Sequence, residues 1–319
     1  MPSPTDERFL FTVFTPTRNR GHVLHRVYES LVSQTFRGFE WLVIDNSSTD
    51  DTPVLMERWQ DEAAFPIRYL YQAVDIGVQG SWRRALAEAR GELFLLIRSA
   101  DTFVPTALER FKFHWDSIPA RERDAFSAVT ALAVDEHGRL YGTQFPRPVI
   151  DSNSLEIRHR YRVTGEKWGF QRTDVLRAYP PPEIVGYTSY MPESIMWRAI
   201  ARRYQTRFVN EVLRTYWRDQ SSSNSAPSDP AVNAPGRLLA AEYQLNQDLS
   251  WLRYDLLGFF REAVIYVRSG WYVGRPLMEQ VKALQPVVAK ILWLVALPVG
   301  TLVYLAERRP PMLRRQPRR

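Results

Sequence analysis

The chain has 319 residues, with 42 lysines and arginines against 35 aspartates and glutamates, and it contains no cysteine. A hydrophobic content of 45% excludes a wholly disordered protein, and the lack of cysteine excludes disulfide scaffolds, thiolate zinc sites and cysteine nucleophiles. The net charge of +7 is unevenly placed, because residues 285–319 carry +6 of it and the remainder carries +1. A nucleic-acid-binding surface would place its charge on the folded body, so we expect no nucleic acid partner.

Strand-like and helix-like segments alternate along the first hundred residues. Apolar runs rich in β-branched and aromatic side chains predict strands at 9–15, 40–44, 67–71 and 92–97. Apolar residues at helical spacing predict helices between them at 22–34, 52–62 and 80–90. This alternation predicts an α/β fold, in which helices cover both faces of a mostly parallel central sheet. Because ligands of such sheets bind beyond the carboxyl ends of the strands, four loops should form the site: 16–21, 45–51, 72–80 and 98–105.

The rest of the chain is less regular. We expect a hairpin of strands 126–134 and 138–145, a helix at 194–204 and a strand at 206–216. A segment rich in serine, proline and asparagine predicts a linker at 221–236. Helical segments follow at about 237–253 and 256–284, and then an apolar run at 291–306. The predicted organisation is therefore a domain at 1–220, the linker at 221–236, and a helical membrane-associating region with a basic tail at 237–319.

Three motifs near the start of the chain resemble those of a known family. They are 11–20 (FTVFTPTRNR), 33–35 (SQT) and 41–52 (WLVIDNSSTDDT). In these motifs, and in the order in which they occur, the chain resembles the family 2 glycosyltransferases over about residues 9–218. The resemblance implies a GT-A domain, which is a Rossmann-like fold of nucleotide-diphospho-sugar transferases. It also implies transfer of a sugar from a nucleotide-diphosphate donor to an acceptor hydroxyl, with inversion at the anomeric carbon.

The resemblance assigns the donor site to the first loops of the sheet. Four consecutive residues match the segment that lines the nucleoside pocket: Pro16, Thr17, Arg18 and Asn19. Asp45 matches the acid that contacts the nucleobase. A carboxylate at a strand end can accept hydrogen bonds from a base or ribose, but it can equally cap the following helix.

Asp75 and Gly77 match the positions of an Asn-x-Gly motif that lies beside the donor in relatives. The alternative is a simple turn, in which Gly77 supplies the positive φ that a turn requires.

The loop after the fourth predicted strand departs from the family pattern. Relatives have an acidic cluster there that serves the ribose and a divalent metal, whereas this chain reads RSAD at 98–101. Mg²⁺ or Mn²⁺ needs oxygen ligands, and Ala100 offers none on its side chain. Either Asp101 therefore holds the metal nearly alone, or Arg98 and Arg83 bind the diphosphate in its place. A further alternative is a non-catalytic GT-A relative that binds a nucleotide sugar or a membrane partner.

Glu193 is the candidate general base. An inverting transfer needs a carboxylate to take the acceptor proton, and 190–194 (YMPES) resembles the acidic motif of the family. The alternative is a helix-terminal acid that only complements the helix dipole. Trp168 and Gly169 match the segment that faces the acceptor. A tryptophan face can stack on a sugar ring, but a large aromatic side chain can equally belong to the core.

The apolar run at 291–306 has 16 residues without a charge, and a basic tail follows it. A membrane span needs about 20 residues, so this run with its flank is near the required length. We expect monotopic or single-pass attachment to the cytoplasmic face of the cell membrane, with the tail on anionic lipid headgroups; a buried core helix is the alternative. The implied partners are a nucleotide-diphosphate sugar, a glycan or lipid-linked acceptor, and this anionic membrane surface.

Overall fold

The computed structural model of the protein describes residues 9–180, 182, 192–217 and 229–308. The chain divides into two compact units, Met1–Asn224 and Ser225–Arg319.

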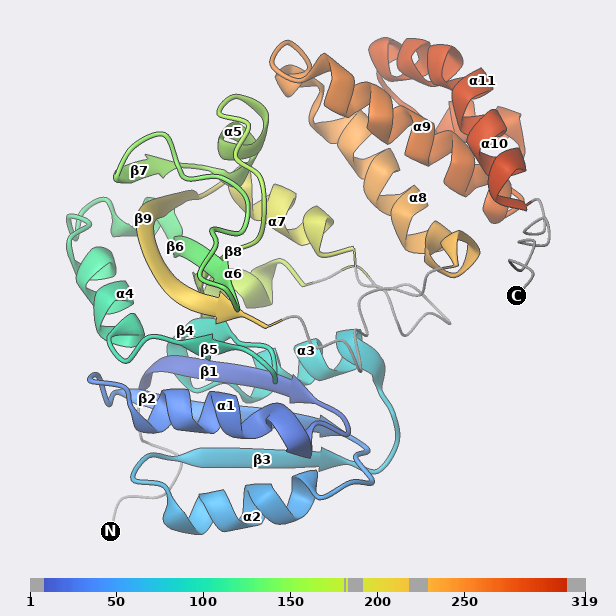
Figure 1. Ribbon diagram of the computed structural model, residues 1–319. Helices are drawn as coiled ribbons and strands as arrows, with labels where there is room; N and C mark the ends of the chain where they lie inside the picture. Colours follow the sequence, from blue (N-terminus) through green and yellow to red (C-terminus); the bar gives the residue numbers. More distant parts are fainter. Residues whose placement is uncertain (1–8, 181, 183–191, 218–228, 309–319) are drawn as a thin grey trace, which may run out of the picture. The chain divides into compact units, whose positions relative to one another are not determined.

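Strands and helices alternate through the first part of the N-terminal unit (Figure 1). The strands are β1 (Phe9–Thr17), β2 (Phe39–Asn46), β3 (Ile67–Gln72) and β4 (Gly91–Leu96). The helices are α1 (Gly21–Val32), α2 (Thr52–Glu62) and α3 (Gly77–Glu88). The four strands pair in parallel, so their carboxyl ends meet at one edge of the sheet. The sequence predicts each of these seven elements, with boundaries that differ by at most three residues.

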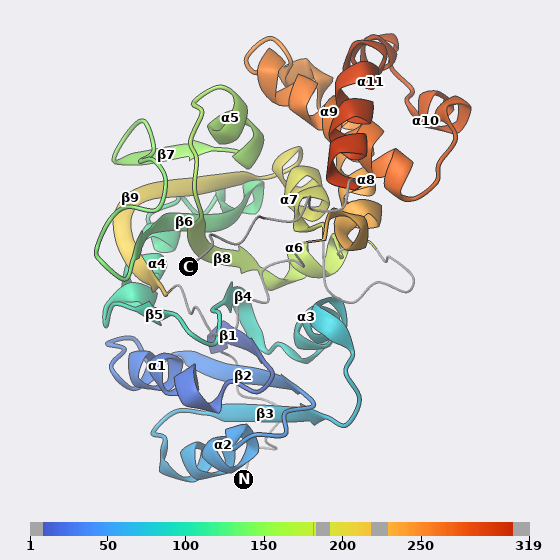
Figure 2. The same ribbon diagram turned by 45° about the vertical axis from the view of Figure 1, so that its right-hand side comes forward.

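The second part of this unit extends the same sheet. Its strands are β5 (Thr102–Phe103), β6 (Phe126–Asp135), β7 (Val149–Ser152), β8 (Lys167–Arg172) and β9 (Gln205–Tyr216). Its helices are α4 (Ala107–Asp116), α5 (Ser154–His159), α6 (Thr173–Ala178) and α7 (Glu193–Ala201), with a 3₁₀ turn at Arg123–Ala125. The described residues form a nine-stranded sheet in the order β3-β2-β1-β4-β8-β6-β9-β5, with β7 paired to β9. The long, curved β9 runs beside β6 and β7 (Figure 2).

The sheet is mixed because β8 is antiparallel to both of its neighbours, β4 and β6. Side chains that alternate along the strands fill two apolar layers. In β1, Phe11 and Val13 pack with α1, α2 and α4 on one face, whereas Phe14 packs with α3, α6 and α7 on the other. The α/β fold with helices on both faces is therefore confirmed.

The predicted hairpin is only half right. The first strand is β6, and it ends in a tight turn in which Asp135 Oδ1 accepts hydrogen bonds from the backbone N–H groups of His137 (3.0 Å) and Arg139 (2.9 Å). The following segment makes an isolated bridge between Leu140 and Val134, and no strand forms at 138–145. β8 pairs with β6 only as far as Leu132, and beyond it Asp135 N–H donates to the Arg139 carbonyl (2.8 Å) and Tyr141 N–H to the Ala133 carbonyl (2.9 Å). The hairpin pairing is limited to this single bridge.

The C-terminal unit is helical. It contains α8 (Pro230–Gln247), a 3₁₀ turn (Leu249–Trp251), α9 (Leu256–Tyr272), α10 (Leu277–Ala283) and α11 (Val287–Arg308). The predicted linker is wrong from Pro230 onward, where the chain is helical. The Asp229 carboxylate caps this helix by accepting a hydrogen bond from Ala231 N–H (2.8 Å), and proline suits the first helical position. The single helix predicted at 256–284 is two helices, because Gly274 (φ +71°) and Pro276 interrupt it.

Helix α11 is apolar on two opposite sides. One stripe is buried in the core of the unit and includes Leu292, Trp293 and Ala296. The other stripe is exposed: Val287, Ile291, Leu294, Val295, Leu302 and Leu305. By length and composition alone, this helix suffices to cross a membrane.

Candidate functional site

Three of the four predicted loops are joined by hydrogen bonds at the carboxyl edge of the parallel strands. Asp75 forms an ion pair with Arg18 and accepts a hydrogen bond from the Asn46 amide. Asn46 Oδ1 in turn accepts from Ile76 N–H at 2.8 Å. Asp75 also accepts from Gly77 N–H at 2.8 Å, and Gly77 begins α3 with φ +66°. The side chains of Asp75 and Asn46 therefore hold the loops after β1, β2 and β3 together.

Asn19 ties the first two loops at a second point. It has a left-handed backbone (φ +53°), its N–H donates to Ser48 Oγ (2.8 Å), and its Oδ1 accepts from Thr49 N–H (2.7 Å). Asparagine tolerates this conformation better than most residues.

Asp45 ends β2 and is fully buried. Its two carboxylate oxygens accept from Ser48 N–H (2.9 Å) and from the Tyr69 hydroxyl (2.5 Å). Burial, with this hydrogen bond, raises the pKa of Tyr69, so the hydroxyl keeps its proton and remains a donor to Asp45. The carboxylate therefore stabilises the turn after β2 and does not cap the following helix, α2, which begins at Thr52.

Several buried polar atoms at this edge lack a hydrogen-bond partner among the described residues. They lie at the carboxyl ends of β1 and β3 and on α3: Thr17 Oγ1, Gln72 Nε2, Gln79 Nε2 and Trp82 Nε1. Most buried polar groups in folded proteins are satisfied, and a ligand bound at this edge would be one source of partners for these atoms. All four atoms can donate a hydrogen bond, which fits a ligand rich in acceptor oxygens.

The loop after β4 contains Asp101, which is fully buried. Its Oδ2 accepts hydrogen bonds from the Nε (3.0 Å) and a terminal nitrogen of Arg214, and its Oδ1 accepts from Trp217 N–H (3.1 Å). Burial raises the pKa of Asp101, and the positive charges of Arg214 and Arg98 oppose that rise. Arg214 lies near the end of β9 and also binds Glu166 through its other terminal nitrogen (3.0 Å).

Arg98 stands in the same loop, with its guanidinium 4.5 Å from the centre of the Tyr216 ring. Burial alone would lower the pKa of Arg98, but Asp101, Tyr216 and Glu166 outweigh burial and leave the pKa raised. Arg98 therefore carries a positive charge at this edge, held by an aromatic face. Arg83 lies in the second turn of α3 and is half-buried.

The side chains of this loop do not suit a divalent metal. Asp101 is the one acid of the 98–101 segment, and Arg214 and Trp217 occupy both of its oxygens. The described part of the chain contains no group of three or more histidine, aspartate or glutamate side chains placed to hold a metal ion. A divalent cation at Asp101 Oδ2 would have to displace a buried arginine, so the geometry gives the prediction of Asp101 as a metal ligand no support.

Glu193 is the first residue of α7 and is accessible to solvent. Desolvation by the surrounding protein raises the pKa of Glu193, a hydrogen bond with Trp197 partly offsets the rise, and the nearby negative charge of Glu166 adds to it. A raised pKa makes a carboxylate a better proton acceptor near neutral pH. Glu166 lies close enough to influence Glu193 and is also bound to Arg214, so it links the candidate base with the loop after β4.

Trp168 and Gly169, the candidates for the acceptor-facing segment, both lie in β8. Trp168 is 3% exposed, its indole N–H donates to the Leu96 carbonyl (2.7 Å), and its ring packs against Phe103 and Phe111. The core alternative therefore applies. Gly169 lies within β8, where an added Cβ would come 2.0 Å from the Val129 carbonyl oxygen, so this glycine permits close strand pairing.

Sequence reasoning missed four side chains of this edge: Glu166, Arg214, Tyr216 and Arg26. Arg26, on α1, donates to the Ala100 carbonyl (3.3 Å) and lies 4.5 Å from the centre of the Trp217 ring. The one signal in the sequence is the run RTYW at 214–217, which has one cationic and two aromatic side chains at the end of a predicted strand.

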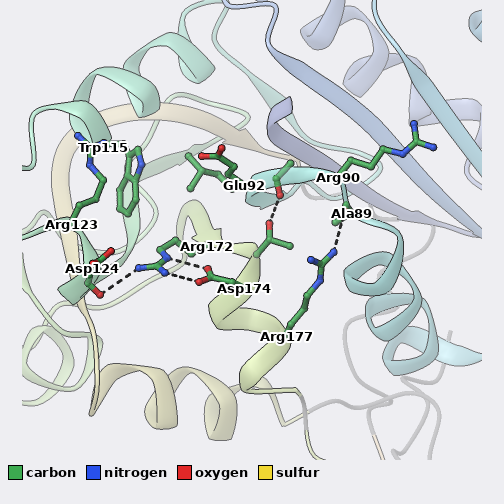
Figure 3. A pocket seen from close by; sticks show the side chains of 12 residues that line it. Ala89, Arg90, Glu92, Trp115, Arg123, Asp124, Arg172, Asp174 and Arg177 are labelled. Atoms are coloured by element: carbon green, nitrogen blue, oxygen red, sulfur yellow. Dashed lines mark hydrogen bonds and ion pairs between the residues drawn. The ribbon is translucent and has the colours of Figure 1, made fainter. Parts of the chain in front are cut away.

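A second polar region lies at the opposite edge, where β4 begins. Figure 3 shows a cavity of about 500 Å³ lined by the start of β4 and by Arg172, Asp174 and Arg177. Arg172 pairs with Asp174 (2.6 Å), and Arg177 donates to the Ala89 carbonyl (2.7 Å). These contacts join α6 to the start of β4, which indicates a structural role.

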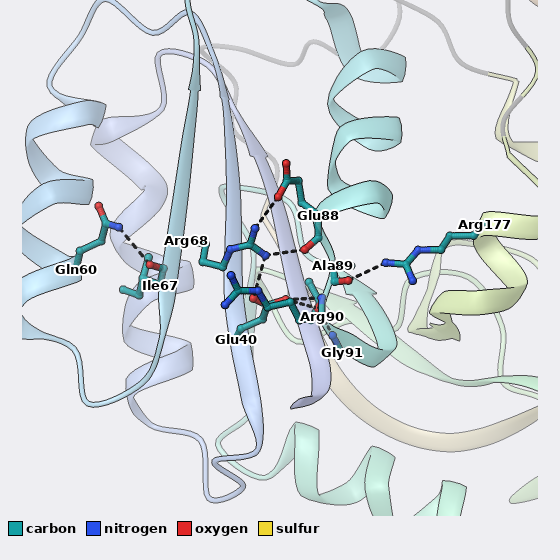
Figure 4. A network of polar contacts seen from close by, with 10 residues as sticks. Glu40, Gln60, Ile67, Arg68, Glu88, Ala89, Arg90, Gly91 and Arg177 are labelled. Atoms are coloured by element: carbon teal, nitrogen blue, oxygen red, sulfur yellow. Dashed lines mark hydrogen bonds and ion pairs between the residues drawn. The ribbon is translucent and has the colours of Figure 1, made fainter. Parts of the chain in front are cut away.

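A buried ion network adjoins this cavity (Figure 4). Glu40 is fully buried and accepts from Arg90 N–H (2.8 Å) and from Arg68 (3.3 Å), which also pairs with Glu88 (2.6 Å). The network fixes the amino-terminal ends of the parallel strands and lies away from the predicted site.

The first part of the chain is similar to known glycosyltransferases. Residues 12–121 match the model of the family described as Glycosyl transferase family 2. The GalNAc(5)-diNAcBac-PP-undecaprenol beta-1,3-glucosyltransferase of Campylobacter jejuni is 29% identical over 97 residues, which are 30% of this chain and 31% of that protein. The abequosyltransferase RfbV of Salmonella typhimurium is 26% identical over 110 residues, which are 34% and 33%. The matched part thus spans about a third of the length of these curated relatives.

Solved structures share the fold over more of the chain. The crystal structure of S. aureus TarS 1-349 in complex with UDP-GlcNAc has a TM-score of 0.65 at 18% identity, and the match covers 93% of this chain and 91% of that one. The mannosyltransferase PcManGT from Pyrobaculum calidifontis, in complex with GDP-Man and Mn²⁺, has a TM-score of 0.51 at 16% identity, covering 96% and 89%. These matches show a GT-A-like fold. Within this fold, residues 12–121, from β1 to α4, are similar to glycosyl transferase family 2.

Proposed function

We propose that the N-terminal unit transfers a sugar from a nucleoside-diphosphate donor to an acceptor hydroxyl, with inversion at the anomeric carbon. The observation that carries this proposal is the set of unsatisfied donors at the carboxyl edge of the parallel strands: Thr17, Gln72, Gln79 and Trp82. This edge lies within the family 2 match, and the joined loops around Asp75 frame it. An edge rich in donors is complementary to the oxygens of a nucleoside diphosphate.

The donor residues fall into two groups in this proposal. Pro16, Thr17, Arg18 and Asn19 line the nucleoside pocket together with Asp75 and Gly77, and Asp45 holds the turn below them. Arg98, with Arg83 on α3, neutralises the diphosphate, because arginine stays charged and binds phosphate oxygens through two parallel donors. Fixed cations at the leaving group stabilise the charge that develops there in the transition state.

Glu193 is the general base of the proposed reaction. The acceptor oxygen attacks the anomeric carbon and gives its proton to the Glu193 carboxylate. The bond from that carbon to the β-phosphate oxygen breaks, and its electron pair leaves with the nucleoside diphosphate. The raised pKa of Glu193 makes its carboxylate a stronger base for this proton transfer.

The test is a screen of nucleotide sugars for hydrolysis and transfer, with and without a chelator, followed by Glu193→Gln. We expect Glu193→Gln to lower kcat by about 10²–10⁴-fold, the usual contribution of a general base, with little change in Tm. Glu279→Gln, in the first turn of α10, is the control for a helix-terminal acid that has no part in the chemistry. If Glu193→Gln turned over at the wild-type rate, the assignment of the base would be wrong. A protein that bound nucleoside diphosphate but turned over no donor would be the non-catalytic alternative.

We propose further that the C-terminal unit attaches the enzyme to an anionic membrane surface, where a lipid-linked or cell-envelope glycan is the acceptor. The exposed apolar stripe of α11 supports this, as does the sequence at 308–319, which has six arginines and no acid. One of the relatives is named for an undecaprenol-linked acceptor. Monotopic attachment at the cytoplasmic face fits best, because nucleotide sugars are cytosolic and the positive tail prefers the same side.

A further inference from the structure

Arg214 occupies a central position among the charges at the end of β9. Its guanidinium is 4% exposed and contacts two carboxylates from different loops, Asp101 and Glu166. Two of its nitrogens bind one oxygen of Asp101, and the third binds Glu166 Oε1 at 3.0 Å. A single arginine therefore uses its three nitrogens to bridge the loop after β4 to the segment before β8.

The charges of this cluster balance without any added ion. Asp101 and Glu166 contribute two negative charges, and Arg214 and Arg98 contribute two positive charges. A divalent cation in a carboxylate site supplies two positive charges to oxygen ligands, and here guanidinium groups supply the same total. Arg214 makes the hydrogen bonds to the buried Asp101, whereas Arg98 lies over the Tyr216 ring, 4.5 Å from its centre.

We propose that the Arg214 guanidinium is the permanent cation of this site and fills the position beside Asp101 where a divalent metal would bind. The protein then binds its diphosphate ligand without a divalent metal. The presence of the diphosphate beside this loop rests on the proposed function. The exclusion of the metal rests only on the contacts of Arg214. Removing Arg214 would leave Asp101 and Glu166 without their shared cation, and two unpaired carboxylates are the ligands that Mn²⁺ prefers.

The test measures the binding of Mn²⁺ alone, through the loss of the free-ion signal in electron paramagnetic resonance. The wild type should bind no Mn²⁺ up to about 1 mM, the range of weak divalent sites. Arg214→Met keeps an unbranched side chain without charge, and it should bind Mn²⁺ at least tenfold more tightly than the wild type. Adding Asp101→Asn to Arg214→Met should abolish that gain.

Arg207→Met is the matched control. Arg207 lies on the same strand, is 12% exposed, and binds both oxygens of Asp151 (2.8 and 2.7 Å), but it contacts no second carboxylate among the described residues. The Arg207→Met variant should bind no more Mn²⁺ than the wild type. An equal gain in both variants would mean that any freed aspartate collects the ion, and it would overturn the special position of Arg214.

Two further results keep the inference testable if Arg214→Met does not fold, which circular dichroism will show. Chelation should leave the Tm of the wild type unchanged, and the affinity of the wild type for nucleoside diphosphates should change by less than twofold. Binding of Mn²⁺ to the wild type below about 100 µM, abolished by Asp101→Asn, would overturn the inference. The proposed function would survive that result as a metal-dependent transferase, whereas a failed donor screen would refute the function and leave the Mn²⁺ result unaffected.

Discussion

Replacing Trp168 tests whether this side chain belongs to the core or to an acceptor site. The indole is 3% exposed, donates to the Leu96 carbonyl at 2.7 Å, and packs against Phe103 and Phe111. Trp168→Ala removes the ring and leaves a cavity between β8 and α4. Trp168→Phe keeps an aromatic ring and removes the hydrogen bond.

The expected magnitudes follow from burial. A tryptophan buries about 150–250 Å² at about 25 cal/mol/Å², which is about 4–6 kcal/mol and agrees with the 3–5 kcal/mol usual for truncation to alanine. Loss of the hydrogen bond to Leu96 should cost Trp168→Phe about 1–2 kcal/mol. For a unit of this size, 1 kcal/mol shifts Tm by about 2–4 °C, so we expect losses of about 6–20 °C for alanine and about 2–8 °C for phenylalanine.

Thermal melts and acceptor kinetics on the same preparations separate the two roles. Phe113→Ala on α4 is the control, since Phe113 is 55% exposed and its loss should change stability by about 0.5 kcal/mol or less. For Trp168→Phe, the acceptor KM should stay within about threefold of the wild type, because a core position makes no contact with the acceptor. A Trp168→Ala variant that melted like the wild type while its acceptor KM rose at least about tenfold would refute the core assignment.

Two other predictions concern pH and membrane binding. Hydrogen bonds from Arg110 lower the pKa of Glu211 from 4.5 to about 2; burial opposes this shift and His114 adds to it. The contribution of Glu211 to stability is therefore complete above about pH 4.5 and is lost as the pH falls toward 2. Glu211→Gln should therefore be less stable than the wild type by about 1–2 kcal/mol at pH 6, after allowance for partial exposure, and urea titrations should show this difference shrinking by pH 3. A difference that stayed constant would contradict the assignment. Leu302→Glu should lower the fraction of protein that floats with anionic vesicles. Val54→Glu is the control and should not lower it, because Val54 is equally exposed (67%, against 66% for Leu302) but lies in the N-terminal unit. Equal binding by both variants would exclude α11 as the membrane contact.

The first half of the N-terminal unit was predictable because its signals are local. In β2, for example, the apolar run 41–44 followed by Asp45 and Asn46 marks both the strand and its end. The positive φ of Gly77 is likewise a property of one residue and its neighbours. The loops after β1, β2 and β3 lie close together because the strands pair in parallel, and the contacts of Asp75 with Asn46 and Arg18 join these loops.

The second half was harder to predict because its pairing is not local. β8 has the short sequence KWGFQR, and its place between β4 and β6 depends on partners about 40 and 80 residues away. For the same reason the sequence leaves Trp168 and Gly169 open between an acceptor contact and the core. Strand pairing places Trp168 in the core and Gly169 against the backbone of β6. Motif position alone could not distinguish these environments.

Asp101 is the one acid of the 98–101 segment after β4, and its contacts explain why it is buried there. A metal site needs several oxygen ligands, so the replacement of its neighbours by Arg98 and Ala100 would leave a single acid with little affinity for a cation. A buried carboxylate without a partner is costly, and it would not persist unless another charge compensated it. Arg214, 113 residues away in sequence, is that charge, and the Trp217 N–H satisfies the remaining oxygen. The retained aspartate thus anchors the end of β9 to the loop that carries Arg98, which explains why its presence in the sequence does not by itself indicate metal binding.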